Sequence, residues 1–448
     1  MRSFTGPVFR PGDEGYDTER AGFNLIVDHR PELVVGATGP ADVAAAIDYA
    51  SARGLAVAVL TTGHGPAVTA DGQVLINTRR MGEVRVDPAA RTAWVGGGVR
   101  WEQVLPRTAP HGLAPLNGSS PNVGVVGYTL GGGVGPLGRE YGFAADRVRG
   151  VDIVTADGQR RRVTADDEPE LFWAVRGGKG NFGVVVGLEF ELVPVARLYG
   201  GGLSFPAEAA ADVLHAYSRW APTVPERMSS SVLLLEFPPL PELPEPLRGR
   251  YVVTVRIAYT GSAADGERLV QPLREAGSPI LDTLGELPYS EVGTIYNDPT
   301  DPVPAYDSNS SLRAFDADAV DTLLSLVGPA AGSPLVVELR QLGGAYTRPP
   351  AVASAVGGRD AAFALFAAGI PQEGREEALH GAHDRLQEAM RPWATGGMTF
   401  NFCGPRDADP ERVKLAFTAA DHARLAKAKA AYDPDNVFRI NHNIPPAG

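Results

Sequence analysis

A histidine between two glycines follows an apolar run of the sequence. His64 lies in Thr61-Thr62-Gly63-His64-Gly65, directly after the apolar residues 55–60. Glycines let backbone amides approach a phosphate closely, and an imidazole can act as a nucleophile or a base. A single histidine is more often a packed or surface residue than a reactive one. The glycines and the strand-like run before His64 favour a cofactor-binding loop, and no other histidine has this setting.

Two segments, 133–138 and 178–183, match the pattern G-x-G-x-x-G. A Rossmann dinucleotide site needs a strand before these glycines and a helix after them. The second segment has a helix-like run before it and a strand-like run after it, and the first is followed by a poor helix start. The glycines therefore indicate either tight turns or a backbone phosphate site outside the Rossmann fold. No G-x-S-x-G or H-E-x-x-H motif supports a hydrolase or a metalloenzyme, and we predict no metal site.

Composition and charge exclude several classes of function. The chain has 448 residues, a formal net charge of -12 and one cysteine, Cys403. An acidic surface repels nucleic acids and anionic lipids, and one cysteine allows no intramolecular disulfide. Neither a signal peptide nor 18 consecutive apolar residues is evident, so we expect a cytoplasmic protein with no membrane segment.

Two regions of different character must position these motifs. The first contains a βαβ unit over 33–60, hairpins over 83–98 and 151–164, a helix over 169–175 and a strand over 184–192. After Pro194, strands alternate with amphipathic helices, which predicts an antiparallel sheet with helices on one face. The predicted strands are 231–237, 251–259, 335–342, 361–367 and 398–403. The predicted helices lie near 207–219, 263–276, 317–327 and 373–391, and a tail helix lies near 409–431.

Motifs along almost the whole chain, taken in order, resemble the berberine-bridge-enzyme-like oxidases of the vanillyl-alcohol-oxidase and cresol-methylhydroxylase superfamily. Each motif is weak alone, but their order and spacing together are specific. The matching pieces are Arg10-Pro11-Gly12-Asp13, Thr62-Gly63-His64, Asp87-Pro88, Gly124-Val125-Val126-Gly127, Gly131-Gly132-Gly133, Asp157-Gly158, Leu171-Phe172-Trp173, Arg176-Gly177-Gly178, Gly180-Asn181-Phe182-Gly183, Tyr432-Asp433-Pro434 and Asn441-His442-Asn443-Ile444.

This resemblance implies an α+β fold with a two-lobed FAD-binding domain of the cresol-methylhydroxylase type and a substrate domain whose antiparallel sheet is backed by helices. We place the FAD domain at 1–198, the substrate domain at 199–406, and a C-terminal segment that returns to the FAD domain at 407–448. The implied activity is that of an FAD-dependent oxidoreductase. It would be an oxidase that takes hydride from an alcohol or related carbon of a sugar or secondary metabolite and passes electrons to molecular oxygen.

The resemblance also implies how the flavin is held. In the family, the histidine at the position of His64 bonds to the 8α-methyl carbon of FAD. Many members have a second bond from a cysteine, but Ser120 stands at that place, so His64 should form the single link. A valine that permits oxygen access matches Val125. The expected FAD contacts are Thr61, Thr62, Gly63, His64, Gly65, Gly118, Ser119, Ser120, Val123, Gly124, Val125, Gly127, Tyr128, Gly132, Gly180, Gly183, Val184, Val185, Asn441 and Asn443.

The catalytic residues are less well defined by the sequence. Many relatives carry Tyr-x-Asn-Phe on a late strand, with the tyrosine as base, whereas Thr399 replaces that tyrosine here and Asn401 remains. Side-chain alternation predicts that Glu338 and Arg340 face the flavin cleft. Glu338 is the leading candidate for the base if burial raises its pKa, and a structural ion pair with Arg340 is the alternative. Tyr346 is the next candidate.

Two other functions stay open at this point. The missing tyrosine is also compatible with a flavin-binding protein that has no redox turnover, such as a metabolite-binding module or a scaffold for a non-redox cyclisation. A flavin dehydrogenase that uses another acceptor is the second. We expect a small-molecule substrate, no nucleic-acid or membrane partner, and a monomer or weak homodimer.

Overall fold

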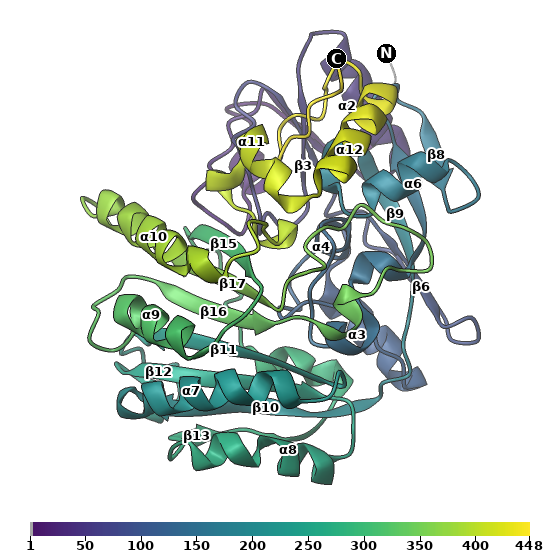
Figure 1. Ribbon diagram of the computed structural model, residues 1–448. Helices are drawn as coiled ribbons and strands as arrows, with labels where there is room; N and C mark the ends of the chain where they lie inside the picture. Colours follow the sequence, from purple (N-terminus) through teal and green to yellow (C-terminus); the bar gives the residue numbers. More distant parts are fainter. Residues whose placement is uncertain (1–2) are drawn as a thin grey trace.

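Three β-sheets divide the protein into an upper and a lower part (Figure 1). The computed structural model describes residues 3–448. The first described residues and the C-terminus lie in the upper part, which contains a four-stranded and a five-stranded sheet. The lower part contains an eight-stranded sheet covered by helices on one face (Figure 1). The fold is therefore the α+β fold that the sequence predicts.

The four-stranded sheet has the order β1-β2-β4-β3, and β2, β4 and β3 run parallel. Its helix α2 begins with Pro40 at the first turn, where a missing N–H costs nothing. The predicted βαβ unit is confirmed, but the sequence did not predict β4, which lies between its two strands. The elements are β1 (Val8–Phe9), α1 (Tyr16–Arg20), β2 (Leu33–Gly36), α2 (Pro40–Ser51), β3 (Val57–Leu60) and β4 (Val74–Asn77).

The five-stranded sheet has the order β5-β6-β9-β7-β8, and its neighbouring strands are antiparallel. Both predicted hairpins are confirmed as β5-β6 and β7-β8. The strands are β5 (Val84–Asp87), β6 (Thr92–Gly96), β7 (Val148–Val154), β8 (Arg160–Val163) and β9 (Val184–Glu191). The helices of this region are α3 (Trp101–Thr108), α4 (Val125–Leu130), α5 (Gly138–Tyr141) and α6 (Pro169–Val175).

The eight-stranded sheet has the order β13-β10-β12-β11-β16-β17-β15, and β14 also pairs with β10. One face packs on α7 to α10 and contributes fully buried apolar residues such as Val255, Leu339 and Leu365. Alternation places Arg256, Glu338 and Arg340 on the opposite face, as the sequence predicts for Glu338 and Arg340. The strands are β10 (Arg197–Pro206), β11 (Met228–Glu236), β12 (Tyr251–Tyr259), β13 (Leu281–Asp282), β14 (Gly285–Pro288), β15 (Tyr306–Leu312), β16 (Val336–Gln341) and β17 (Phe363–Gly369). The helices are α7 (Ala210–Trp220), α8 (Ala263–Glu275), α9 (Ala317–Val327) and α10 (Glu376–Met390).

The predicted strand over 398–403 is wrong. The segment contains a short 3-10 helix, Phe400–Phe402. The side chain of Asn309 binds its backbone, accepting from the Thr399 N–H and donating to the Phe402 carbonyl, so no neighbouring strand is needed. Met398 and Cys403, which alternation would put on opposite faces, have their sulfur atoms 3.2 Å apart.

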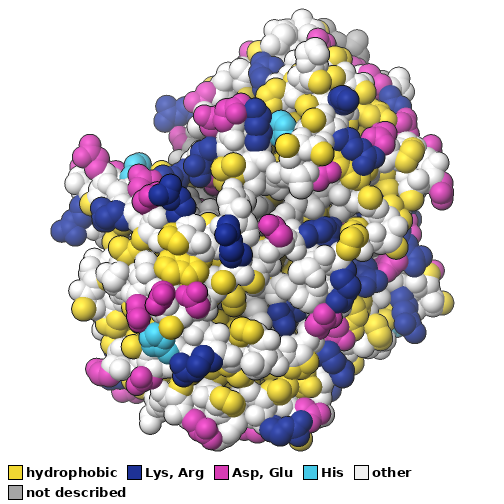
Figure 2. Space-filling model, in the orientation of Figure 1, with side chains coloured by type: hydrophobic (Ala, Val, Ile, Leu, Met, Phe, Trp, Pro, Cys, Tyr) yellow, Lys and Arg dark blue, Asp and Glu magenta, His cyan; other side chains and the backbone are white. Residues whose placement is uncertain are grey.

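The tail helix is also interrupted. It consists of α11 (Pro410–Val413) and α12 (Ala419–Tyr432), and the Thr418 hydroxyl caps α12 by accepting from the Asp421 N–H. From α12 the chain returns to the upper part (Figure 1). No helix within residues 3–448 has both the length and the apolar character to cross a membrane. Figure 2 shows the surface hollowed between α10 and the upper part.

A buried lysine fixes this returning segment. Lys429 Nζ lies 2.6 Å from Asp433 Oδ2 and also donates to the carbonyls of Asn181 and Phe438. Both charged side chains are fully buried. Asp433 in turn accepts from the N–H groups of Val437 and Phe438. This network holds the C-terminal segment against the second glycine motif.

We predict that Lys429→Met lowers the free energy of unfolding by about 3–5 kcal/mol, because it leaves the Asp433 charge buried without its partner. Lys427→Met is the control, since Lys427 is exposed on the same helix. Urea denaturation of both variants gives the comparison. Equal stability of the two variants would show that the Lys429 pair does not anchor this segment.

Candidate active site

His64 lies in a rigid loop after β3. Gly63 has φ of +73°, and a β-carbon there would lie 2.6 Å from the Gly22 Cα, so only glycine fits. The Phe23 and Asn24 N–H groups donate to the carbonyls of Thr62 and Gly63. The His64 ring stacks on Phe23 with centroids 4.0 Å apart. Backbone and ring contacts together therefore fix the direction of the imidazole.

One nitrogen of the His64 ring is engaged and the other is free. Nδ1 lies 2.9 Å from the Thr62 hydroxyl oxygen. Nε2 is buried and has no hydrogen-bond partner among residues 3–448. Burial and the nearby Arg100 charge lower the pKa of His64 to about 4. The ring is therefore neutral at pH 7, and Nε2 is its available nitrogen.

Segment 118–128 lies against this loop. A β-carbon on Gly124 would lie 3.2 Å from Thr61 Cγ2, and one on Gly118 would lie 2.9 Å from the Tyr128 ring. The hydroxyls of Ser120 and Tyr128 are buried without a partner in the described part of the chain. Gly127 is exposed, with open space around its Cα.

The second glycine motif and the C-terminal segment complete a ring of contacts. A β-carbon on Gly131 would lie 3.3 Å from Lys179 Cε. Asn181 Nδ2 donates to the His442 carbonyl, and Asn441 Nδ2 donates to the Gly180 carbonyl.

His442 then contacts the segment that leads back to the His64 loop. Its Nε2 lies 3.0 Å from the Gly404 carbonyl oxygen. A β-carbon on Gly65 would lie 3.9 Å from the carbonyl oxygen of the preceding Cys403. The segments predicted to bind FAD are thereby brought together.

Residues 61–65, 118–128, 178–183 and 441–443 form this ring of segments, and their chemistry fits FAD. Buried polar atoms almost always have hydrogen-bond partners. Several side chains of the ring have a buried polar atom with none in residues 3–448, namely His64, Ser120, Tyr128, Asn441 and Asn443. The phosphates, ribityl hydroxyls and ring polar atoms of a flavin nucleotide would satisfy such a set. Gly183, Val184 and Val185 lie at the start of β9, next to this ring, and Val125 is fully buried in the adjacent core.

Comparisons with known proteins agree with this geometry. Residues 31–164 match the family described as "FAD binding domain", and residues 400–445 match "Berberine and berberine like". The chain therefore contains both of these family regions and is similar to the berberine-bridge-enzyme-like FAD-linked oxidoreductases. It is 29% identical to (R)-6-hydroxynicotine oxidase of Paenarthrobacter nicotinovorans over 100% of this chain and 98% of that protein.

Other relatives extend the comparison. The chain is 23% identical to a chitooligosaccharide oxidase of Gibberella zeae, over 98% of this chain and 92% of that one. The solved structure of 6-hydroxy-D-nicotine oxidase from Arthrobacter nicotinovorans superposes with a TM-score of 0.85, at 28% identity, over 100% of this chain and 99% of that chain.

Glu338 is in an ion pair, so the expected raised pKa is wrong. Arg340 Nη2 lies 3.1 and 2.8 Å from its two carboxylate oxygens, and Arg256 Nη1 lies 3.5 Å from one of them. Burial alone would raise the pKa of Glu338, but the two guanidinium groups more than offset it, and the pKa is lowered. The structural alternative considered from the sequence is the one observed.

The other catalytic candidates hold the first glycine motif. Asn401 donates to the Tyr128 carbonyl and accepts from the Gly133 N–H. The Tyr346 hydroxyl donates to the Gly135 carbonyl and accepts from the Gly135 N–H. Thr399 lines a small cavity together with Gly131 and other residues. These contacts place the three candidates beside the segments predicted to bind the flavin. The polar groups of Asn401 and Tyr346 are already hydrogen-bonded to the backbone there.

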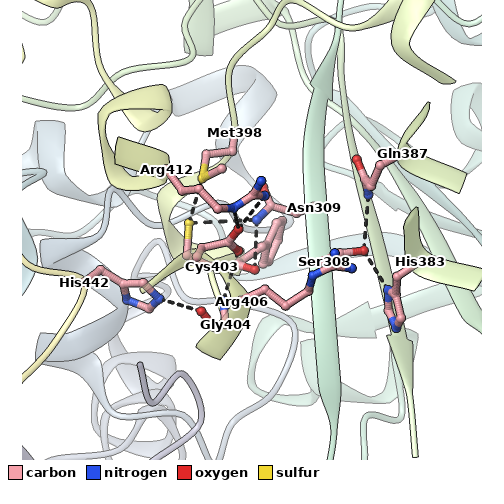
Figure 3. A network of polar contacts seen from close by, with 12 residues as sticks. Ser308, Asn309, His383, Gln387, Met398, Cys403, Gly404, Arg406, Arg412 and His442 are labelled. Carbon is pink, nitrogen blue, oxygen red and sulfur yellow. Dashed lines mark hydrogen bonds and ion pairs between the residues drawn. The ribbon is translucent and has the colours of Figure 1, made fainter. Parts of the chain in front are cut away.

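Sequence reasoning missed Lys179 and the side chain of His442. Lys179 Nζ lies 3.3 Å from His442 Nδ1 and 4.3 Å from the centroid of the Phe400 ring. Burial lowers the pKa of both Lys179 and His442. Figure 3 shows His442 pointing to Gly404 beside β15. Lys179 lies inside the second glycine motif, 178–183, and a lysine at such a place was the sequence signal that could have identified it.

Asp307 was also missed. It lies on the same face of β15 as Asn309, and a β-carbon on Gly404 would lie 3.3 Å from its Cβ. Its Oδ1 is buried with no partner in the described chain. Burial, together with the charge of Asp407, raises the pKa of Asp307 to about 7.

We predict that Asp307 makes stability fall with rising pH. Because its folded pKa is raised above that of an unfolded aspartic acid, about 4, the fold favours the neutral form. Its stabilising effect is fully present below pH 4 and is lost as the pH rises toward 7. Asp307→Asn should be more stable than the wild type at pH 8 and should lack this dependence, as measured by chemical denaturation between pH 4 and 8. Asp301→Asn, at an exposed site, is the control. An unchanged pH dependence in Asp307→Asn would contradict the assignment.

Proposed function

We propose that this protein is an oxidase that holds FAD through His64 and oxidises a small organic molecule with molecular oxygen as electron acceptor. The observation that carries the proposal is the ring of segments whose buried polar atoms, including His64 Nε2, have no protein partner in residues 3–448. Residues 1–198 and 407–448 would hold the cofactor, and residues 199–406 would hold the substrate. The substrate would come from the alcohols, sugars or secondary metabolites.

When bound, FAD supplies a hydride acceptor for a carbon of the substrate. The residues of the chain do the rest. The backbone amides of 61–65 and 118–123 would bind the pyrophosphate, since glycines permit close approach. Tyr128, Asn441 and Asn443 would bind polar atoms of the flavin. Arg256, Glu338 and Arg340 would orient the substrate, and Glu338 would act by keeping the two arginines in place rather than as the base. Thr399, Asn401 and Tyr346 would position the glycine motif beside the ring.

His64 Nε2 is proposed to bond to the 8α carbon of the flavin. Three features support Nε2 as the atom that forms the bond: the ring is neutral, Nε2 has no partner, and Nδ1 is engaged with Thr62. Forming the bond removes one hydrogen from nitrogen and one from carbon, so it needs a two-electron acceptor, for which molecular oxygen suffices. Ser120 cannot provide a thioether, so the link is single.

We predict that wild-type protein keeps its yellow colour through acid precipitation and that His64→Ala releases the flavin into the supernatant. The reason is that His64 provides the single covalent attachment. The control is His422→Ala, because His422 also has a buried Nε2 without a partner in the described residues but lies outside the ring of segments. The covalent assignment would be contradicted if the flavin stayed with the precipitated His64→Ala protein, or if it left the precipitated wild-type protein.

Val125 is proposed to leave oxygen a path to the flavin. A grass pollen allergen with the same fold has glucose dehydrogenase activity, and an isoleucine-to-valine variant of it is a glucose oxidase. We predict that Val125→Ile slows the return of yellow colour when anaerobically reduced protein is mixed with air-saturated buffer. Val126→Ile, which adds the same methylene to the neighbouring residue, should reoxidise at the wild-type rate. Equal rates in both variants would remove Val125 from this role.

A further inference from the structure

The helix-free face of the large sheet contains two arginines and one glutamate in contact. Arg256 and Arg340 both pair with Glu338, and each of the three side chains is at most 10% exposed. Their strands are β12 and β16, on either side of β11. One carboxylate cannot neutralise two guanidinium groups, so this cluster has an excess positive charge.

Arg340 also has an unused donor. Its Nη2 binds Glu338 and its Nη1 donates to the Val134 carbonyl, but its buried Nε has no acceptor in residues 3–448. A buried donor without an acceptor is costly in a low-dielectric site. Asp298 also acts electrostatically on Arg340, but it forms no ion pair with either arginine among the described contacts. The tyrosines nearby, Tyr296 and Tyr128, are neutral at pH 7 because burial raises their pKa values.

Aromatic rings border this cluster. Arg256 and Arg340 lie 5.3 and 5.4 Å from the Tyr296 ring centroid, and Arg340 lies 5.3 Å from that of Phe402. Phe402 in turn packs on Phe366, with centroids 5.4 Å apart, and both rings are partly exposed. Phe366 is paired with Glu338 across the sheet. A planar apolar ring can therefore contact these aromatics while a polar group reaches the arginines.

The cluster also lies beside the flavin-binding segments. Val134, whose carbonyl binds Arg340, belongs to the first glycine motif, and Arg340 acts electrostatically on the Tyr128 hydroxyl. A molecule held here would be next to the site proposed for the flavin ring.

We propose that the substrate is a planar, conjugated molecule with an anionic oxygen that binds at the Arg256–Arg340 cluster and accepts from Arg340 Nε. This inference rests on the proposed function and narrows its substrate class. A neutral sugar would leave the excess charge unbalanced, and a cationic amine would be repelled by two guanidinium groups. A charge-assisted hydrogen bond to Arg340 is stronger than one between neutral groups.

The test compares three probes on the flavin-loaded protein by isothermal titration calorimetry: 2-naphthoate, 2-naphthamide and 2-naphthylmethylamine. They share one ring system and differ in charge. The expected result is that the naphthoate binds at least about tenfold more tightly than the amide, with the amine weakest; tenfold equals about 1.4 kcal/mol. This comparison in the wild type needs no variant, so it stands even if a substitution impairs folding.

Arg340→Gln should abolish the preference for the naphthoate over the amide. Arg268→Gln, at an exposed arginine on α8, should keep it. Equal binding of acid and amide by the wild type, or tighter binding of the amine, would overturn the proposal. The proposal would also be overturned if Arg340→Gln shifted the flavin reduction potential but left the affinity for naphthoate unchanged. Arg340 would then interact with the cofactor rather than with the substrate. Failure of the proposed function would be seen separately: the purified protein would contain no flavin, or its reduced flavin would not regain its yellow colour in air.

Discussion

Polar groups that leave water must find partners, and this constraint governs the centre of the protein. The segments around His64, Tyr128 and Asn443 come from distant parts of the sequence and meet in a ring. Each of these three side chains has a buried polar atom that has no hydrogen-bond partner within residues 3–448. These atoms can remain without partners because other contacts hold the surrounding segments in place. Gly63 packs against Gly22, and Lys429 ties the returning segment to the second glycine motif. A polar ligand with the chemistry of FAD would supply the missing hydrogen-bond partners.

The large sheet has the complementary role. Its helix-facing side forms an apolar core. Its other side carries Arg256, Arg340 and Glu338, and the single carboxylate balances one of the two positive charges. Glu338 shows how one position serves both stability and function, since its single carboxylate pairs with both Arg256 and Arg340 but balances one of their two charges and leaves the Arg340 Nε donor free. The backbone of the glycine motif is held from this side by Asn401, Tyr346 and Arg340. The two parts of the protein are therefore joined where the chemistry would occur.

Local patterns predicted much of the fold, because the hairpins, α6, α9 and β12 depend on turn residues and alternation that are visible in the sequence. The exceptions have physical reasons. β15 has a polar sequence because Ser308 bonds to His383 of α10 on one face and Asn309 binds the 398–403 segment on the other (Figure 3). The 398–403 segment alternates like a strand, but Asn309 takes up its backbone groups. The position of Glu338 was predictable, but its pKa depends on Arg256, a residue 82 positions away that only the sheet register brings near.

The order of the motifs, rather than local physics, predicts the flavin contacts, and these contacts are the central claim. A crystal structure of the flavin-loaded protein tests it most directly. We expect continuous electron density between His64 Nε2 and the flavin, with Tyr128, Asn441 and Asn443 hydrogen-bonded to the flavin and the Arg340 side chain on the substrate side of the flavin ring. Flavin bound elsewhere, or a His64 Nε2 in contact with water alone, would contradict the account.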